Sequence, residues 1–248
     1  MDGRSDVSGR PPVPRARSGS ILLRLVMLSL LLPVLAACNP FDRGFEWHQR
    51  LVLEVETPDG VVSGGSVVAV RVWESMAPGD AYGSLGTDIT GEASFMEVAP
   101  GRYLSALLGG NSTPGLGLDL FFSDPQPNVW ERAELLEDMQ GETRVVPPER
   151  YPLLVTFTDI DDPASVKQVD PADLEAAFGP GVELKRVVLE ITAEDTTQRR
   201  LRELLGWLGW SRQEFLAAGN GTNPLKMPND SPRGYTTIGR TEFVRKAR

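Results

Sequence analysis

The sequence predicts an α+β protein: an N-terminal antiparallel β-sandwich-like domain followed by a small α+β domain, after a cleaved signal peptide. Three observations support this fold class. Apolar side chains recur at every second position from residue 51, as in a half-buried strand. The pair Pro147-Pro148 divides the chain, because neither proline can extend a helix or a central strand. Beyond this pair, strand-like runs alternate with helix-like ones.

The predicted signal peptide, residues 1–37, holds an apolar run that begins near Ile21, follows several arginines and ends in two alanines. Such a run is typical of a secretory signal peptide. A transmembrane helix is one alternative, but a span needs about 20 apolar residues, and Arg24 and Pro33 interrupt this run. Cleavage by the general signal peptidase, which would leave Cys38 as an ordinary thiol, is another.

The run ends in Leu35, Ala36, Ala37 and Cys38, and Cys38 is the only cysteine of the chain. This tetrapeptide resembles the lipobox of bacterial lipoproteins. The resemblance implies that signal peptidase recognises Leu35, Ala36 and Ala37, cuts before Cys38, and leaves a thiol that carries diacylglycerol and acyl chains such as palmitate. Two or more acyl chains anchor a protein stably at a bilayer.

The resemblance also implies a location. A lipid-anchored chain of this kind is expected in the bacterial cell envelope, facing the periplasm. Asn39 rather than aspartate follows the cysteine, which resembles the enterobacterial signal for the outer membrane. The outer membrane is therefore favoured over the inner one.

The composition of the mature chain argues against nucleic acid as a partner. Removing residues 1–37 takes away five arginines and two aspartates, and leaves 20 basic and 32 acidic side chains among 211 residues. The resulting net charge of −12 opposes binding to a phosphate backbone. It also opposes an electrostatic grip on anionic lipid, so the acyl chains must hold the protein at the membrane. With Cys38 acylated, no disulfide can form within the chain.

Residues 38–49 are expected to form an acylated tether, and residues 50–123 the β-sandwich-like domain. Leu51, Leu53 and Val55 alternate with polar neighbours and predict the first strand of this domain. An Asp-Gly turn follows, and a β-branched run then predicts the second strand.

The stretch Thr87–Tyr103 predicts a turn, a strand and a Pro-Gly turn, and Tyr103–Leu108 a further strand. Its pattern resembles the T-D-x-x-G-x-x-x-F-x-x-V-x-P-G-x-Y run of transthyretin-like and carboxypeptidase-regulatory-like β-sandwich modules. The resemblance covers only this stretch, and another antiparallel sheet remains the alternative.

Residues 124–150 are expected to be a helical linker. Asn128 can cap a helix over Trp130–Gln140, which Gly141 would end. The preceding run Gly109–Gly117 is rich in glycine but lacks the Gly-Lys-Ser/Thr ending of a phosphate-binding loop. We therefore expect a flexible connection there.

The α+β domain is expected at 151–248 and begins with an apolar strand, Tyr151–Thr158. One apolar stripe marks its second helix, in which four leucines fall at helical spacing. The other expected elements are a strand at Ser165–Val169, a helix opened by Asp170, a strand at Val182–Thr192, a helix capped by Thr196 or Thr197, a helix with a capping box at Ser211–Glu214, and an edge strand at Thr241–Val244.

A second resemblance rests on the run PLLVTFTDIDDPASVKQVDPADL at 152–174, with Ala177–Val182 and Leu189–Thr192. These segments are similar to a family of uncharacterised proteobacterial proteins. Many of those also begin with a lipobox and carry a β-segment like Val55–Pro58. The resemblance spans most of the mature chain and implies an architecture and a location, but no activity.

Three aspartates, Asp159, Asp161 and Asp162, follow the predicted strand at 151–158. Ca²⁺ binds several carboxylate and carbonyl oxygens, so these residues are candidate calcium ligands. The spacing is not that of an EF-hand, and turn formation is the alternative role. We expect no other cofactor.

Trp207 and Trp210 are a candidate aromatic surface for a glycan or an envelope protein, since exposed aromatic rings stack on sugars and anchor partners. Completing the core is the alternative role. The single histidine, His48, lies on the expected tether and predicts no catalytic triad unless it folds back.

The sequence thus favours a membrane-anchored extracytoplasmic lipoprotein of unknown activity, a non-enzymatic protein that binds a ligand or serves envelope structure, and it identifies no catalytic residues. The alternative is a carboxylate-based hydrolase that acts on envelope glycan, because an acidic chain offers many candidate carboxylate pairs.

Overall fold

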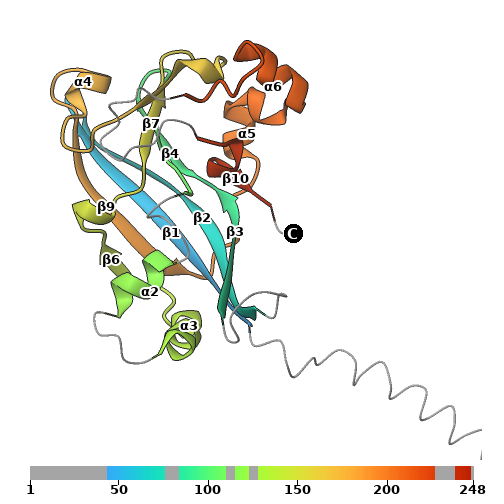
Figure 1. Cartoon of the computed structure of the whole chain (residues 1–248). Coiled ribbons are helices and arrows are strands. Elements are labelled where there is room, and N and C mark those ends of the chain that lie inside the picture. The colour runs from blue at the N-terminus through green and yellow to red at the C-terminus, as the bar shows by residue number, and fades with distance from the viewer. Residues whose placement is uncertain (1–43, 76–83, 110–114, 123–127, 227–237, 247–248) are drawn as a thin grey trace, which may run out of the picture. The chain divides into compact units, whose positions relative to one another are not determined.

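The computed structural model describes residues 44–75, 84–109, 115–122, 128–226 and 238–246 (Figure 1). Its strands form two antiparallel sheets with few helices, a β-rich α+β fold. The six-stranded sheet has the order β10-β3-β2-β1-β9-β6. Its strands are β1 (Gly44–Thr57), β2 (Gly60–Ser75), β3 (Ser84–Glu92), β6 (Thr143–Val145), β9 (Glu183–Thr192) and β10 (Val244–Arg245). The four-stranded sheet has the order β4-β5-β7-β8, with β4 (Ser94–Ala99), β5 (Arg102–Ala106), β7 (Leu154–Phe157) and β8 (Val166–Gln168).

Strand β1 shows why the six-stranded sheet forms. Successive side chains of a strand point to opposite faces, and every second residue of β1 faces the core. Trp47, Leu53 and Val55 are buried on this face. The alternation predicted from residue 51 is therefore confirmed. The strand begins earlier than expected, at Gly44, inside the range 38–49 assigned to the tether.

The chain passes from one sheet to the other at Ala93, which alone separates β3 from β4. Two buried serines join the sheets there. Ser66 Oγ donates to the Ala93 carbonyl at 2.9 Å, and Ser94 Oγ donates to the Leu51 carbonyl at 2.7 Å. A Cβ on Gly64 would lie 2.6 Å from Met96 Cβ, so a glycine in β2 allows β4 to cross closely.

Strands from the two predicted domains share both sheets. β1 pairs with β9 as well as with β2, and β5 pairs with β7. The expected linker, 124–150, supplies β6 to the six-stranded sheet. All described residues belong to one compact unit, Arg43–Arg248. The predicted boundary therefore does not separate one sheet from the other.

Apolar residues of both sheets meet in the core. Val70 and Ile89 of the six-stranded sheet share one cluster with Val155 and Phe157 of the other. A second cluster joins residues of β1 and β9 to residues of β4, β5 and β7, among them Leu53, Val187, Met96, Leu104 and Leu154.

The described helices are short. They are α2 (Gly115–Phe121), α3 (Val129–Asp138), α4 (Glu175–Phe178), α5 (Arg200–Leu204) and α6 (Arg212–Ala218), with 3₁₀ turns η2 (Pro148–Arg150), η3 (Pro163–Ser165), η4 (Gly206–Gly209) and η5 (Arg240–Glu242). Figure 1 shows α2 and α3 low in the view beside the six-stranded sheet, α4 by the upper end of β1 and β9, and α5 and α6 at the upper right.

Two predicted caps are confirmed. Asn128 Oδ1 accepts from the N–H groups of Trp130 and Glu131, and Ser211 forms a capping box with Glu214. Two other predicted caps are wrong. The helix expected to open at Asp170 begins at Glu175, and the helix expected to follow Thr196 or Thr197 begins at Arg200. Helix α2 lies partly in the expected connection 109–117.

The C-terminal segment docks through an aromatic cluster. Phe243 is fully buried, and its ring lies 5.4 Å from that of Trp207 and 5.9 Å from that of Phe157, centroid to centroid. A backbone hydrogen bond also holds this segment: Ala93 N–H donates to the Phe243 carbonyl at 2.8 Å. These contacts place β10 against the end of β3.

Candidate functional site

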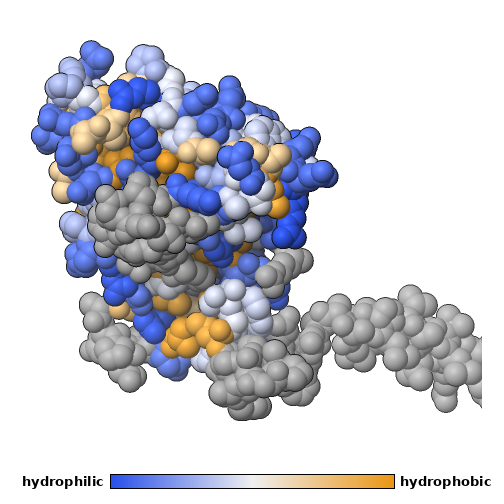
Figure 2. Space-filling view, turned by 45° about the horizontal axis from the view of Figure 1, so that its top comes forward, coloured by the Kyte–Doolittle hydropathy of each residue, from blue (hydrophilic) through white to orange (hydrophobic). Residues whose placement is uncertain are grey.

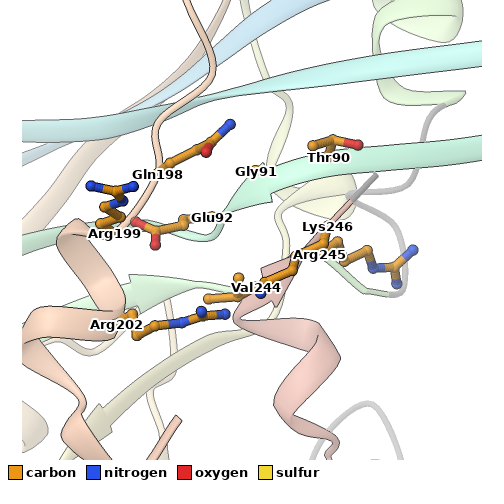
Figure 3. Close-up of a pocket in the computed structure, with 9 residues that line it drawn as sticks. All are labelled: Thr90, Gly91, Glu92, Gln198, Arg199, Arg202, Val244, Arg245 and Lys246. Carbon is orange, nitrogen blue, oxygen red and sulfur yellow. The ribbon is translucent and has the colours of Figure 1, made fainter. Parts of the chain in front are cut away.

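A pocket with a volume of about 450 Å³ opens where the end of β3, the start of α5 and strand β10 meet (Figure 3). We call it the basic pocket, because four of its side chains are cations. Its lining residues are Thr90, Gly91, Glu92, Gln198, Arg199, Arg202, Val244, Arg245 and Lys246. Segments that are distant in the sequence thus form one site.

Glu92 joins β3 to α5. It is the last residue of β3 and only 2% exposed. Its Oε2 accepts from the backbone N–H of Leu201 at 2.8 Å. The first N–H groups of a helix have no partner within the helix, so an acceptor from another strand satisfies one of them. The buried carboxylate therefore fixes the start of α5 relative to the sheet.

Arg199 is held between two anchors. On its N-terminal side, Thr197 Oγ1 accepts from Val67 N–H at 2.9 Å, and Thr197 N–H donates to the Val67 carbonyl at 2.9 Å. On its C-terminal side lies the bond between Leu201 and Glu92. Arg199 has a φ of +74°, a left-handed conformation that is uncommon for a residue other than glycine. Its backbone is thus fixed by contacts on both sides.

The opposite wall of the basic pocket is β10. Arg245 pairs with Gly91 in the sheet. A Cβ on Gly91 would lie 3.0 Å from the carbonyl oxygen of Val67, and its φ is +135°, so glycine is required for this close packing. Arg245 Nε donates to the Thr241 carbonyl at 3.3 Å, and Arg245 Nη2 lies 3.9 Å from Glu242 Oε1.

The basic pocket holds a local excess of positive charge. Its lining carries four cations and one carboxylate, a net charge of +3. Among the residues that the structure describes, Arg199, Arg202 and Lys246 form no ion pair. Figure 3 shows Arg199 and Arg202 on one wall and Arg245 and Lys246 on the other. The arrangement suits a bound anion.

The outer face of β1 and β9, by contrast, carries paired charges, which we call the ion-pair row. Arg186 binds both carboxylate oxygens of Glu54, at 2.7 and 2.8 Å. This bond holds the pKa of the Glu54 carboxyl below its ordinary value, against the opposing effect of desolvation. The other pairs of the row are Arg50 with Glu190 and Glu194, and Lys185 with Glu56.

The predicted calcium ligands form turns. Asp159 Oδ1 accepts from Asp161 N–H at 3.0 Å, and Asp162 Oδ1 accepts from Ala164 N–H at 2.8 Å. Among the described residues, no group of three histidine, cysteine or acidic side chains is arranged to hold a metal ion. The carboxylates of Asp159 and Asp162 thus have the turn-forming role that was the alternative to binding calcium.

The structure separates the two candidate tryptophans. Trp207 is 1% exposed, and its Nε1 donates to the Ile160 carbonyl at 3.1 Å, so it belongs to the core. Trp210 is 37% exposed. A joint aromatic surface of the two is therefore not formed, and only Trp210 is available to a partner.

His48 lies on β1 and not on a free tether. Its Nδ1 is 2.5 Å from the carbonyl oxygen of Glu194. Leu35, Ala36, Ala37 and Cys38 lie outside the described residues.

A second pocket, of about 590 Å³, lies between β5, β7, β8 and α4. Its charged residues have both signs, Arg102 and Lys167 against Asp170 and Asp173. Arg102 is already bound to the carbonyls of Ala177 and Phe178. This pocket therefore offers less unpaired charge to a ligand than the basic pocket.

Comparisons with protein families, with curated proteins and with solved structures find no match. The candidate site thus rests on its own geometry. Among the described residues, no helix is long and apolar enough to cross a membrane. Figure 2 shows hydrophilic residues over much of one face, with hydrophobic residues in small groups between them.

No residue of the basic pocket was predicted from the sequence. One signal was present: residues 199–248 contain ten basic and four acidic side chains, a net charge of +6, whereas residues 1–198 carry −15. Such an asymmetry between parts of a chain indicates an interaction surface. The partner of Glu92, an N–H 109 residues away, leaves no comparable trace.

Proposed function

We propose that the protein is a lipid-anchored protein of the bacterial cell envelope that binds a ligand. The observation that carries the anchor is the placement of the single cysteine, Cys38, directly after Leu35, Ala36 and Ala37 at the end of an apolar run. Two or more acyl chains on this thiol would keep the mature chain at a bilayer despite its net negative charge.

The basic pocket supports the binding role. Arginine stays protonated at every physiological pH, so its side chains hold negative charge and do not exchange protons with a substrate. Three of the four cations that line the pocket are arginines. These residues can therefore bind a negatively charged ligand by charge complementarity.

Acylation is tested in cells of a bacterial host with labelled palmitate. The wild-type chain should incorporate the label, globomycin should cause the unprocessed precursor to accumulate, and Cys38→Ser should remove the label. Ser29→Ala, within the apolar run, serves as the control and should leave labelling intact. Processing that is insensitive to globomycin, or a Cys38→Ser chain that stays labelled, would contradict the anchor.

Membrane sorting is tested by fractionation. The wild-type chain is expected in the outer-membrane fraction, and Asn39→Asp should move it towards the inner one. A wild-type chain in the inner membrane would contradict the proposed location without affecting acylation.

An assay for product release distinguishes the binding role from an enzymatic one. We expect the purified chain to release no product from a panel of envelope polysaccharides. A measured turnover that is lost on a single Asp→Asn or Glu→Gln substitution would replace the binding role with a carboxylate-based hydrolase.

A further inference from the structure

We infer that the basic pocket binds a small anion with at least two negative charges, and that a phosphoryl group is the class that fits best. This inference deepens the proposed binding role and names its ligand class. It rests on the charge, geometry and rigidity of the pocket, and not on acylation of Cys38.

The positive charge of the pocket favours a ligand with two or more negative charges over a monoanion. The lining of four cations and one carboxylate has a net charge of +3, which Glu242, 3.9 Å from Arg245 and outside the lining, offsets in part. A monoanion would neutralise less of this excess than a phosphate monoester or a diphosphate would. Since like charges in one cavity repel each other, the more highly charged ligand relieves more repulsion.

The type of cation favours oxygen anions of fixed geometry. Guanidinium groups donate in a planar fork that matches two oxygens of a carboxylate or phosphate. Arg199 and Arg202 stand on the α5 wall and Arg245 on the β10 wall (Figure 3). A phosphoryl group has three terminal oxygens and can accept from more than one guanidinium, whereas one carboxylate has two.

Cations near the pocket but outside it have other contacts. Arg240 Nη1 donates to the Trp210 carbonyl at 2.6 Å, and its guanidinium lies 4.6 Å from the centre of the Phe215 ring. Arg200 lies 5.2 Å from the centre of the Phe95 ring. Arg199 and Arg202, on either side of Arg200, make no such contact with the described residues. Arg199 and Arg202 are therefore free of the contacts that hold Arg200 and Arg240.

The backbone of the pocket is fixed before any ligand arrives. Thr197 and Leu201 anchor the segment that carries Arg199, and the buried Phe243 anchors β10. Glu92 acts as a positioning residue, because its Oε2 accepts from Leu201 N–H and holds α5 in place. A fixed backbone lowers the entropy cost of binding. The volume of 450 Å³ lies in the range of small-molecule sites.

The inference is tested by titration calorimetry of the full chain in detergent solution with inorganic pyrophosphate, inorganic phosphate and acetate. Pyrophosphate should bind most tightly, phosphate next and acetate least. Charge-assisted hydrogen bonds are lost when both α5 arginines are replaced, so Arg199→Gln with Arg202→Gln should weaken pyrophosphate binding about ten-fold or more. Raising the salt concentration should also weaken it.

Arg212→Gln is the matched control, an exposed arginine of the same basic segment that does not line the pocket. It should change the affinity less than two-fold. Unfolding curves of each variant establish that it is folded. Absence of binding to pyrophosphate, equal binding of acetate, or equal losses in the control and the double variant would each overturn the inference.

Vesicles separate the two sources of a phosphoryl group. If the ligand is a free phosphate compound, pyrophosphate binds and vesicles with phosphatidic acid do not compete. If it is a lipid headgroup, vesicles of phosphatidic acid in phosphatidylcholine compete with pyrophosphate, and phosphatidylcholine alone does not. Both results support the inference. Since no arm depends on Cys38, failure here and failure of acylation are distinguishable.

Discussion

The ion-pair row and the basic pocket differ in how their charged side chains are paired. In the row, Arg186 binds Glu54 through two hydrogen bonds, and neighbouring charges pair across β1 and β9. In the pocket, cations gather around a single carboxylate, which is occupied by a backbone N–H. Charges that are paired within the fold contribute to its stability, whereas Arg199, Arg202 and Lys246, which form no ion pair with the described residues, are available to a ligand.

The largest expected effect concerns the apolar anchor that holds β10, one wall of the pocket, against the core. Phe243→Ala removes a fully buried ring from the cluster around Trp207 and should lower the free energy of unfolding by about 3–5 kcal/mol. Urea unfolding followed by tryptophan fluorescence measures this. Val145→Ala, at a side chain that is 58% exposed, should cost little. Equal losses in the two variants would show that β10 is not anchored through Phe243.

The next effect concerns the buried carboxylate. Glu92→Ala leaves the Leu201 N–H without its acceptor and should cost about 1–3 kcal/mol in unfolding. Glu92→Gln should cost less, because its amide oxygen can still accept. Glu203→Ala, at an exposed residue of α5, is the control. Hydrogen exchange at Leu201 should rise in Glu92→Ala alone; unchanged exchange would mean that Glu92 does not hold α5.

The ion-pair row should respond to pH. Since the pKa of Glu54 is lowered in the folded state, its contribution to stability is present above its unfolded pKa and is lost as pH falls through the folded one. Glu54→Gln should therefore be less stable than wild type at pH 7, with the difference shrinking below about pH 4. Glu183→Gln, on the same strand as Arg186, is the control. A difference that does not vary with pH would contradict the assignment.

The smallest expected effect concerns the cations of the pocket. Arg199→Gln with Arg202→Gln removes like charges and no ion pair, so the free energy of unfolding should stay within about 0.5 kcal/mol of wild type or rise. Arg186→Gln should lower it, because the pair with Glu54 is lost. A clear loss of stability in the double variant would mean that these arginines stabilise the fold, which would remove the contrast between the two regions.

The core face of β1 and two helix caps were predictable because each depends only on residues a few positions apart in the sequence. The alternation through Leu53 and Val55 defines the core face of β1, and the caps at Asn128 and Ser211 need partners only two or three positions away. The cap predicted at Thr197 failed for a related reason. Its hydroxyl accepts from Val67 N–H, a partner 130 residues away that no local pattern indicates.

The pairing of the sheets and the site itself were not predictable in this way. The alternation in β1 does not specify that β9 is its neighbour, and Pro147-Pro148 indicated a boundary where both sheets continue. The basic pocket depends on the same long-range pairing, since Gly91 meets Arg245 only through the sheet. Charge composition indicated a basic C-terminal part, but not that four of its cations line one pocket.

The position of β1 in the centre of its sheet has a kinetic consequence. Glu54 and Arg186 are 132 positions apart, and β1 acquires its second neighbour only when β9 has been synthesised. Topologies dominated by such distant contacts fold slowly. A nascent chain that ends before Thr192 would leave one edge of β1 open to aggregation, and one that ends before Phe243 would expose the rings around Trp207.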